Sequence, residues 1–332
     1  MTTVTSGRAA TLIGALALLG AACAPLEGRR ADTTGQSGGG IGGTGVMAEA
    51  AGLGVFGTIT GLGSIDLNGL HIQIPAGIAR DDLLGSAIAP LAVGQSVAVV
   101  TAEIEDALVA RSVVEILPLV GPVEGVDTLH RRITVMGTSV RLDPSTPLLD
   151  RGRDVALLPA AIAPGDWLAV SGLWREGVVV ASRIERLPPQ TLARATGLLR
   201  VVDGATRIGG TEIAEADRAE AGFAAVTGPY RDGRLVTQRI RAGAGALFPT
   251  TLDRLVVEAF LARNPNDPGY HLSGFGIPMD PASTVAATVG QRSIFVGRYD
   301  GTFLIERSFP LSEDAGTRRG TLERIGTGRL LQ

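Results

Sequence analysis

The residues best suited to ligand recognition in this sequence are its few aromatic side chains. Aromatic rings combine a flat apolar face with a polar group, so they can stack on sugar rings or on a partner. The candidate ligand-binding residues are Trp174, Tyr230, Tyr270 and Tyr299. A rim position for Trp174 would allow this role. The alternative interpretation places one of the two tryptophans, Trp167 and Trp174, in a core.

A second kind of chemistry is indicated at Cys23, the only cysteine of the chain. Residues 1–22 have the parts of a secretory signal, with Arg8 before an apolar run over 9–20. The small residues before Cys23 resemble a bacterial lipobox, although Gly20 stands where leucine is preferred. We therefore expect cleavage and lipidation at Cys23. The alternative is an ordinary signal peptide cut near residue 22, with an incidental thiol.

Lipidation would attach the mature chain to a membrane, because buried acyl chains contribute about 0.8 kcal/mol per CH₂. The residue after the cysteine is Ala24 rather than aspartate. By analogy with lipoprotein sorting, this predicts a location in the cell envelope, at the outer membrane and facing the periplasm.

The remaining reactive side chains form no catalytic pattern. His71, His130 and His271 occur in three different parts of the chain, whereas a metal ion needs converging ligands. Ser273 lacks the G-x-S-x-G elbow of a hydrolase nucleophile. The acidic run 103–106 lacks the spacing of a calcium loop and is interpreted as a turn. We expect neither an enzyme nor a bound metal or cofactor.

Residues 40–45 fit the dinucleotide pattern G-x-G-x-x-G but lack its context. That motif needs a buried strand before the first glycine and a helix after the last one. Here the preceding residues 35–39 are polar or glycine. The segment is interpreted as a flexible Gly-rich tether.

The elements that must position the aromatic residues are short strands. Runs of β-branched residues are separated by turn pairs such as 176–177, 232–233 and 300–301. The pattern of strand, turn and strand recurs four times, with an initial hairpin before each copy. About five strands per copy favour an all-β fold of tandem, small, OB-like five-stranded β-barrels, since closure removes exposed edges.

These patterns divide the chain into an N-terminal signal peptide, a tether, four repeats and a tail. The expected segments are a lipoprotein signal peptide at 1–22, a Gly-rich flexible tether at 23–51, β-barrel repeats at 52–118, 121–188, 194–243 and 252–311, and a tail at 312–332. The third repeat is the shortest, and its closure is left open.

Composition argues against nucleic acid as a partner. The formal net charge is -3, and aromatic residues make up 4% of the chain. Single-stranded nucleic acid is held by aromatic side chains on a positive groove, which this composition does not favour.

A family resemblance adds to this interpretation. The glycine-rich run 40–45, followed by GTITGLGSI over 57–65 and Asn68-Gly69, resembles the DUF5666 family of repeated, secreted bacterial β domains. Family members commonly have phenylalanine where this chain has Leu62. The resemblance implies the fold and an exported setting, and it implies no catalytic residues.

Two functional hypotheses remain open. In the first, the chain is a non-catalytic envelope lipoprotein whose modules bind an envelope protein or serve a structural role. In the second, it binds a glycan or small ligand through Trp174 and the three tyrosines. A broad apolar patch would favour the first hypothesis, and a concave aromatic cleft the second.

Overall fold

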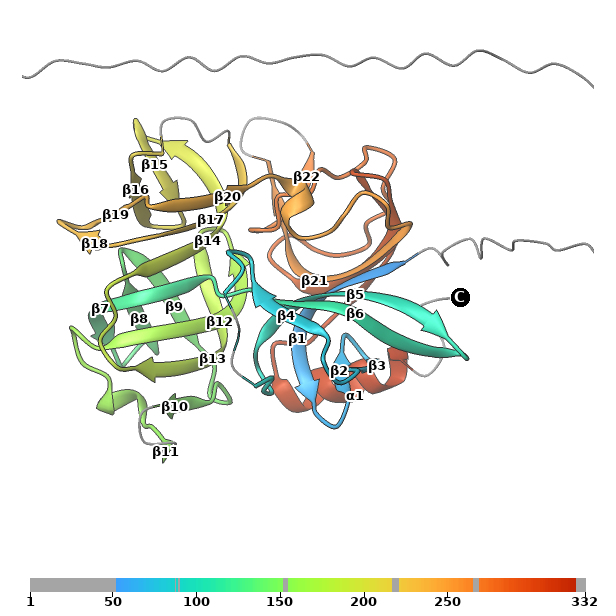
Figure 1. Ribbon diagram of the computed structural model, residues 1–332, viewed down its shortest axis with the longest axis horizontal. Coiled ribbons are helices and arrows are strands. Elements are labelled where there is room, and N and C mark those ends of the chain that lie inside the picture. The colour runs from blue at the N-terminus through green and yellow to red at the C-terminus, as the bar shows by residue number, and fades with distance from the viewer. Residues whose placement is uncertain are drawn as a thin grey trace, which may run out of the picture. The chain divides into compact units, whose positions relative to one another are not determined.

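The computed structural model describes residues 52–326, apart from positions 87 and 89 and the stretches 152–154, 217–220 and 265–268. Nearly every regular element in this part of the chain is a β-strand (Figure 1). The expectation of an all-β protein built on small OB-like barrels is confirmed.

Module one (53–115) is a closed ring of five strands with one additional strand. Its strands are β1 (Leu53–Gly61), β2 (Ile65–Leu67), β3 (Leu70–Gln73), β4 (Ala79–Asp82), β5 (Ser96–Ile104) and β6 (Ala107–Glu115). Around the ring, β1 pairs with β2, β2 with β3, β3 with β6, β6 with β5, and β5 with β1. Only β3 and β6 are parallel within the ring, and β4 extends it by pairing with β6. Closure satisfies the ladder edges that isolated hairpins would expose.

Module two (119–187) repeats this order. Its elements are β7 (Leu119–Asp127), β8 (Arg132–Val135), β9 (Thr138–Leu142), β10 (Leu148–Asp150), β11 (Val155–Ala156), the 3₁₀ turn η1 (Pro159–Ala161), β12 (Trp167–Arg175) and β13 (Val178–Leu187). The ring closes through β7, β8, β9, β13 and β12, again with one parallel pair, β9 with β13.

Module three (193–242) closes through an interrupted final hairpin. Its strands are β14 (Ala193–Val202), β15 (Ala205–Ile208), β16 (Thr211–Ala214), β17 (Gly222–Gly228), β18 (Tyr230–Arg231), β19 (Arg234–Val236) and β20 (Arg239–Ala242). Pro229 separates β17 from β18, since proline has no N–H for the ladder. Opposite it, Thr237 turns its N–H toward the Ala214 carbonyl oxygen at 3.1 Å. With β19 and β20 taken as one bulged strand, the ring is complete.

Module four (254–310) keeps the order with a looser second hairpin. The elements of this region are the 3₁₀ turn η2 (Ala244–Ala246), β21 (Arg254–Arg263), β22 (Tyr270–Leu272), β23 (Arg292–Tyr299), β24 (Phe303–Pro310) and the helix α1 (Ala315–Gly326). β22 pairs only with β21, and the next segment contributes a single parallel bridge, Met279 to Phe303. Pro278 and Pro281 flank Met279, and their missing N–H groups prevent a longer ladder there.

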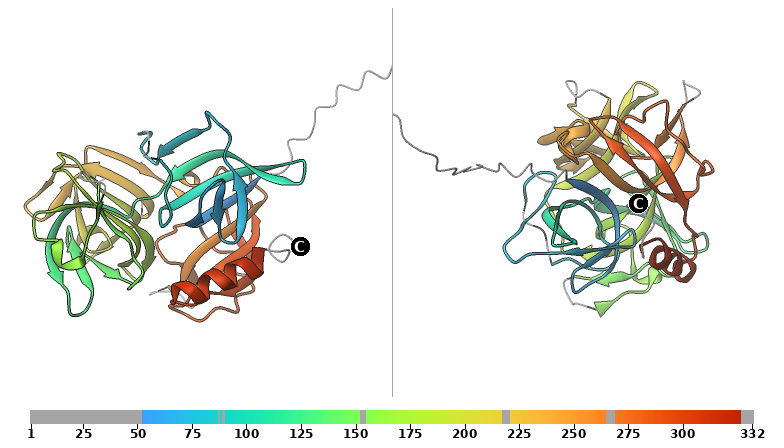
Figure 2. Two further views of the ribbon diagram at one scale, coloured as in Figure 1. Left: turned by 90° about the horizontal axis from the view of Figure 1, so that it is seen from below. Right: turned by 90° about the vertical axis from the view of Figure 1, so that its right-hand side faces the viewer.

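The segment expected to be a tail contains helix α1. Asp314 begins it by accepting the Thr317 backbone N–H at 2.8 Å. Leu322 and Ile325 of α1 are buried in the same core cluster as Leu67 and Ile72 of module one. The helix is the red coiled ribbon in both views of Figure 2. Spaced three residues apart, the two side chains lie on one helix face, and their burial stabilises the helix. With so few apolar residues, the sequence carries little amphipathic signal for it.

The modules join in pairs through backbone ladders. The parallel pair β1 and β21 connects modules one and four, with Leu53 opposite Arg254 and Phe56 opposite Val257. A short antiparallel pairing of β7 with β14 connects modules two and three, with Leu119 opposite Ala195 (Figure 1). Each ladder therefore extends across a boundary between modules, and the space between modules is lined by strands from more than one of them.

Candidate ligand-binding site

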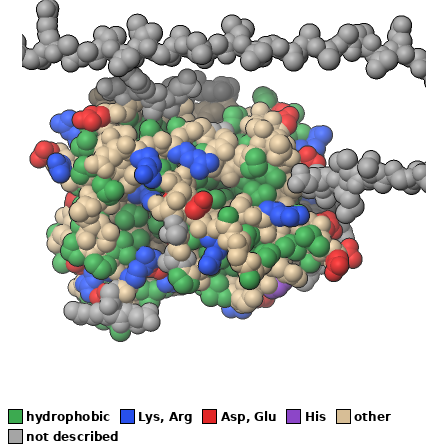
Figure 3. Space-filling view, viewed as in Figure 1, with side chains coloured by type: hydrophobic (Ala, Val, Ile, Leu, Met, Phe, Trp, Pro, Cys, Tyr) green, Lys and Arg blue, Asp and Glu red, His purple; other side chains and the backbone are tan. Residues whose placement is uncertain are grey.

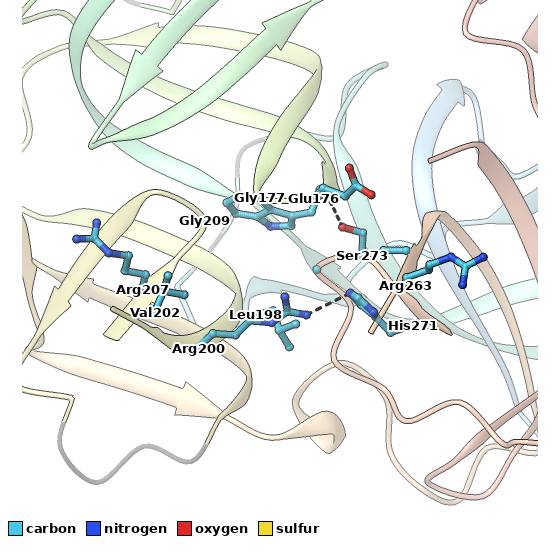
Figure 4. Close-up of a pocket in the computed structure, with 13 residues that line it drawn as sticks. Glu176, Gly177, Leu198, Arg200, Val202, Arg207, Gly209, Arg263, His271 and Ser273 are labelled. Atoms are coloured by element: carbon cyan, nitrogen blue, oxygen red, sulfur yellow. Dashed lines mark hydrogen bonds between the residues drawn. The ribbon is translucent and has the colours of Figure 1, made fainter. Parts of the chain in front are cut away.

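A pocket of about 310 Å³ lies where strands of modules two, three and four meet (Figure 4). Its size falls at the lower end of the range for small-molecule sites. β12 and the turn after it provide one wall, β14 and β15 a second, and β21 with β22 a third. The lining is mainly apolar, with Trp174, Leu198 and Val202 among its walls.

Trp174 is seated among glycines from three separate segments. A Cβ atom at Gly197, Gly209 or Gly274 would collide with the indole ring, so these positions must lack a side chain. The indole Nε1–H donates to the Thr196 carbonyl oxygen at 2.8 Å. The ring is therefore held in one orientation, with only 8% of the residue exposed.

The turn between β12 and β13 connects module two to module four. Glu176 and Gly177 both have positive φ, 50° and 82°, as a tight hairpin turn requires. The Glu176 backbone N–H donates to the Ser273 hydroxyl at 3.0 Å. This bond holds the turn, and the Glu176 side chain with it, at the edge of the pocket (Figure 4).

Arg200 and His271 meet across the pocket. The Arg200 guanidinium donates to Nε2 of His271 at 3.1 Å (Figure 4). Because arginine only donates, Nε2 must be an acceptor, and the ring proton of neutral His271 lies on Nδ1. Nδ1 is buried and has no hydrogen-bond partner. Burial, reinforced by the Arg200 charge, lowers the pKa of His271, which favours this neutral form.

The positive charges around the pocket are only partly neutralised. Arg207 forms an ion pair with Glu212 at 2.8 Å. Arg263 lies over the Tyr270 ring, 5.6 Å from its centroid. Within the described part of the chain, neither Arg200 nor Arg263 has a carboxylate partner within ion-pair distance. Partial withdrawal of the Arg200 guanidinium from water lowers its pKa, although the side chain as a whole stays exposed.

The four predicted aromatic residues do not share one cleft. Trp174 lines the pocket, but it is a buried residue of a core cluster and not the exposed rim residue that was expected. Tyr270 precedes the lining residue His271, with 39% of its surface exposed. The Tyr230 hydroxyl donates to the Glu124 carboxylate at 2.5 Å, away from the pocket lining. Tyr299 is only 3% exposed, so it is a core residue rather than a rim residue.

The histidines and the serine considered in the sequence analysis have separate hydrogen-bond partners. His71 lies 2.8 Å from Asp66 and His130 lies 2.7 Å from Asp127, each at an exposed position. Among the residues with described positions, no group of three or more His, Cys, Asp or Glu could hold a metal ion. Ser273 accepts the N–H bond of Glu176.

Sequence reasoning missed Arg200 and Arg263, and it considered His271 only as a metal ligand. No local motif marks these residues, because they come from β14, β21 and β22, far apart in the chain. Alternation along a strand predicts which side chains face out, but not which other module they face.

A second, more polar cleft of about 580 Å³ is lined by residues of modules one, two and three. Asp82 there forms an ion pair with Arg194 at 2.5 Å. Glu115, only 5% exposed, has its pKa raised from 4.5 to about 7. Burial is the largest cause; Arg151 and Arg194 partly oppose it, and Glu185 reinforces it.

The face in Figure 3 shows acidic and basic side chains interspersed rather than gathered into one basic patch.

The predicted signal peptide, the lipidation site Cys23 and the tether lie outside the described residues. In the part of the chain that is described, no helix has the length and apolar character to cross a bilayer.

Comparison with known proteins identifies one segment. Residues 120–185, which lie entirely within module two, match the family model described as Domain of unknown function (DUF5666). The expected family is thus confirmed for this segment, which does not include the motif at 40–69. No curated protein and no solved structure matched the chain.

Proposed function

We propose that this chain, whose second module is a DUF5666 domain, is a non-catalytic binding protein of the bacterial cell envelope. A lipid on Cys23 would anchor it to the outer membrane, facing the periplasm, and the tether would hold the modules away from the bilayer. The signal-like segment 1–22 and the small residues before Cys23 support the anchor.

The observation that carries the binding role is the pocket between modules two, three and four. It combines an apolar wall that includes the fixed Trp174 ring with a few polar groups, which is the usual composition of a small-molecule site. Trp174 also suits a sugar ring, so a glycan fragment is one form that the ligand could take.

The polar groups of the pocket support binding rather than catalysis. A serine nucleophile needs a base beside it, and that base needs an orienting group. His271 contacts Arg200, a cation, and the Ser273 hydroxyl accepts the Glu176 backbone N–H. Neither contact activates a nucleophile.

The anchor is tested by metabolic labelling with an alkyne fatty acid and fractionation of the cells. We expect label and membrane association in the natural chain, and loss of both in Cys23→Ala. An unlabelled natural chain, or an unchanged membrane fraction for Cys23→Ala, would contradict the anchor.

The pocket is tested by filling it. Leu198 is half-buried in the pocket wall, and Leu198→Trp would occupy the space that a ligand needs. We expect small molecules from envelope extracts to be retained by the natural chain and not by the filled variant, as measured by native mass spectrometry. Equal retention by both would contradict the pocket as the site. A stoichiometric envelope protein crosslinked equally to both forms would favour a protein-binding role instead.

A further inference from the structure

The pocket carries charges that its described lining does not balance. Three arginines, Arg200, Arg207 and Arg263, oppose one carboxylate, Glu176, which leaves two net positive charges among the lining residues. Glu212, outside the lining, pairs with Arg207 and also with Arg234, so at least one net positive charge remains at the pocket. An unpaired charge beside a low-dielectric wall attracts a counter-charge more strongly than it would in water.

Arg200 is positioned to receive that counter-charge. One of its terminal nitrogens is engaged by His271, and that contact holds the guanidinium beside the pocket (Figure 4). A guanidinium has five N–H donors in a plane, so further donors remain to bind an anionic oxygen pair. Because neutral His271 accepts from Arg200, it positions the arginine without neutralising its charge.

The apolar part of the lining determines what can be attached to the anion. Leu198 and Val202 lie on either side of Arg200 along β14, and Trp174 of β12 adds apolar surface from a second wall. The hydrogen bond from the indole to the Thr196 carbonyl oxygen fixes the orientation of that ring. Burial of an apolar group against this wall stabilises binding by roughly 25 cal/mol per Å². The site therefore fits a molecule with two parts, one charged and one apolar.

We propose that the pocket binds a small amphipathic anion, with a carboxylate or phosphate head group on Arg200 and a flat apolar body against Trp174. This inference rests on the proposed function and adds the class of ligand. Arg200 is the residue that recognises the head group, and His271 is a positioning residue that holds Arg200.

The test measures the binding of three probes with the same ring system to the full-length chain by calorimetry. They are 2-naphthoate, 2-naphthyl phosphate and the neutral 2-naphthamide. We expect one or both anions to bind at least 10-fold more tightly than the amide, as one charge-assisted contact would provide. The anion that binds more tightly identifies the preferred head group, carboxylate or phosphate. Raising the salt concentration should weaken the binding of the two anions and leave the affinity of the amide unchanged.

Two variants with opposite expected effects sharpen the test. Arg200→Gln should reduce anion affinity about 10-fold with little effect on the amide. Glu176→Gln removes the negative charge from the lining and should increase anion affinity a few-fold. Arg111→Gln, at an exposed position of β6 in module one, is the matched control and should change nothing. Thermal unfolding of each variant verifies that it is folded.

The outcomes separate the two proposals. If the amide binds as tightly as both anions and Arg200→Gln has no effect, the anion class is overturned while the binding role stands. If none of the three probes binds the folded natural chain, the ligand-binding function of the pocket is overturned together with the ligand class.

Discussion

Glu258 of β21 and Arg292 of β23 form a buried ion pair that joins module four to module one. The Glu258 side chain is 3% exposed and that of Arg292 is 5% exposed, with 2.7 Å between the nearest charged atoms. The second Glu258 carboxylate oxygen accepts the Thr58 backbone N–H at 2.9 Å, and Arg292 also donates to the Thr58 hydroxyl at 3.1 Å. The pair therefore satisfies polar groups on β1, the strand that carries the ladder between the modules.

Breaking this pair should destabilise the protein strongly. Glu258→Gln leaves Arg292 buried without its counter-charge, which costs about 3–5 kcal/mol of the free energy of unfolding. Urea denaturation of the two proteins measures the difference. Arg319→Gln, in the exposed pair with Glu323 on α1, is the control and should change stability by less than about 1 kcal/mol. Similar small losses for both variants would contradict the role of the buried pair.

Glu115 should make stability fall as the pH rises. Its folded-state pKa, raised by burial to about 7, lies above the ordinary value of 4.5. The uncharged carboxyl therefore fits the fold, and ionisation between pH 4.5 and 7 costs free energy. At about 1.4 kcal/mol per pKa unit, the full cost above pH 7 is on the order of 3 kcal/mol.

Replacement of Glu115 tests this dependence. Glu115→Gln should raise the free energy of unfolding at pH 8 and have little effect at pH 4, as followed by urea denaturation at both values. The exposed Glu103→Gln serves as the control, with no expected gain at either pH. A Glu115→Gln variant that is less stable at pH 8 would show that the carboxylate is needed in its charged form.

His271 should respond to the charge of Arg200. Burial is the larger cause of its lowered pKa, the Arg200 charge adds to it, and Glu176 acts in the opposite direction. Arg200→Gln should therefore raise the pKa of His271 without restoring its ordinary value, as measured by NMR titration of the ring protons. No change in Arg200→Gln would show that the contact is absent in solution.

The same shift predicts an effect on stability at acidic pH. Because the folded-state pKa of His271 is depressed, its contribution is present above the ordinary value of 6.5 and is lost as the pH falls through the folded-state value. His271→Gln should reduce the loss of stability between pH 7 and 5, as measured by thermal unfolding. An unchanged pH profile would contradict this contribution.

The glycines that contact the Trp174 ring should not tolerate a methyl group. Gly274 has φ of +72°, and a Cβ there would collide with the indole ring, whereas Gly233 has φ of +75° with open space around it. Both alanine variants carry the backbone cost of about 1–2 kcal/mol. Gly274→Ala should cost roughly 1–3 kcal/mol more through overpacking, as measured by urea denaturation. Equal losses would show that the indole moves aside freely.

Local chemistry of the sequence predicts the strands and their turns well. Asp232-Gly233 and Glu176-Gly177 are predicted turns, and all four residues have positive φ in the structure. Alternating and β-branched segments predict the strands, because side chains on a strand point to its two faces in turn. The proposed export signal also rests on linear sequence alone, namely a short apolar run before Cys23.

The binding site could not be predicted in this way. Tyr299 and Tyr270 look alike in the sequence, but one is a core residue and the other is exposed. The pocket depends on which surfaces of modules two, three and four face one another, and strand alternation carries no information about that.

The sequence by itself therefore determined the all-β repeat architecture and its turns. These follow from the preferences of neighbouring residues. Only the tertiary structure decided that Arg200, His271 and Trp174 share a pocket and that Glu258 and Arg292 pair across β21 and β23. Such contacts arise when distant segments pack together, and their free energy depends on shape and burial that no local pattern contains.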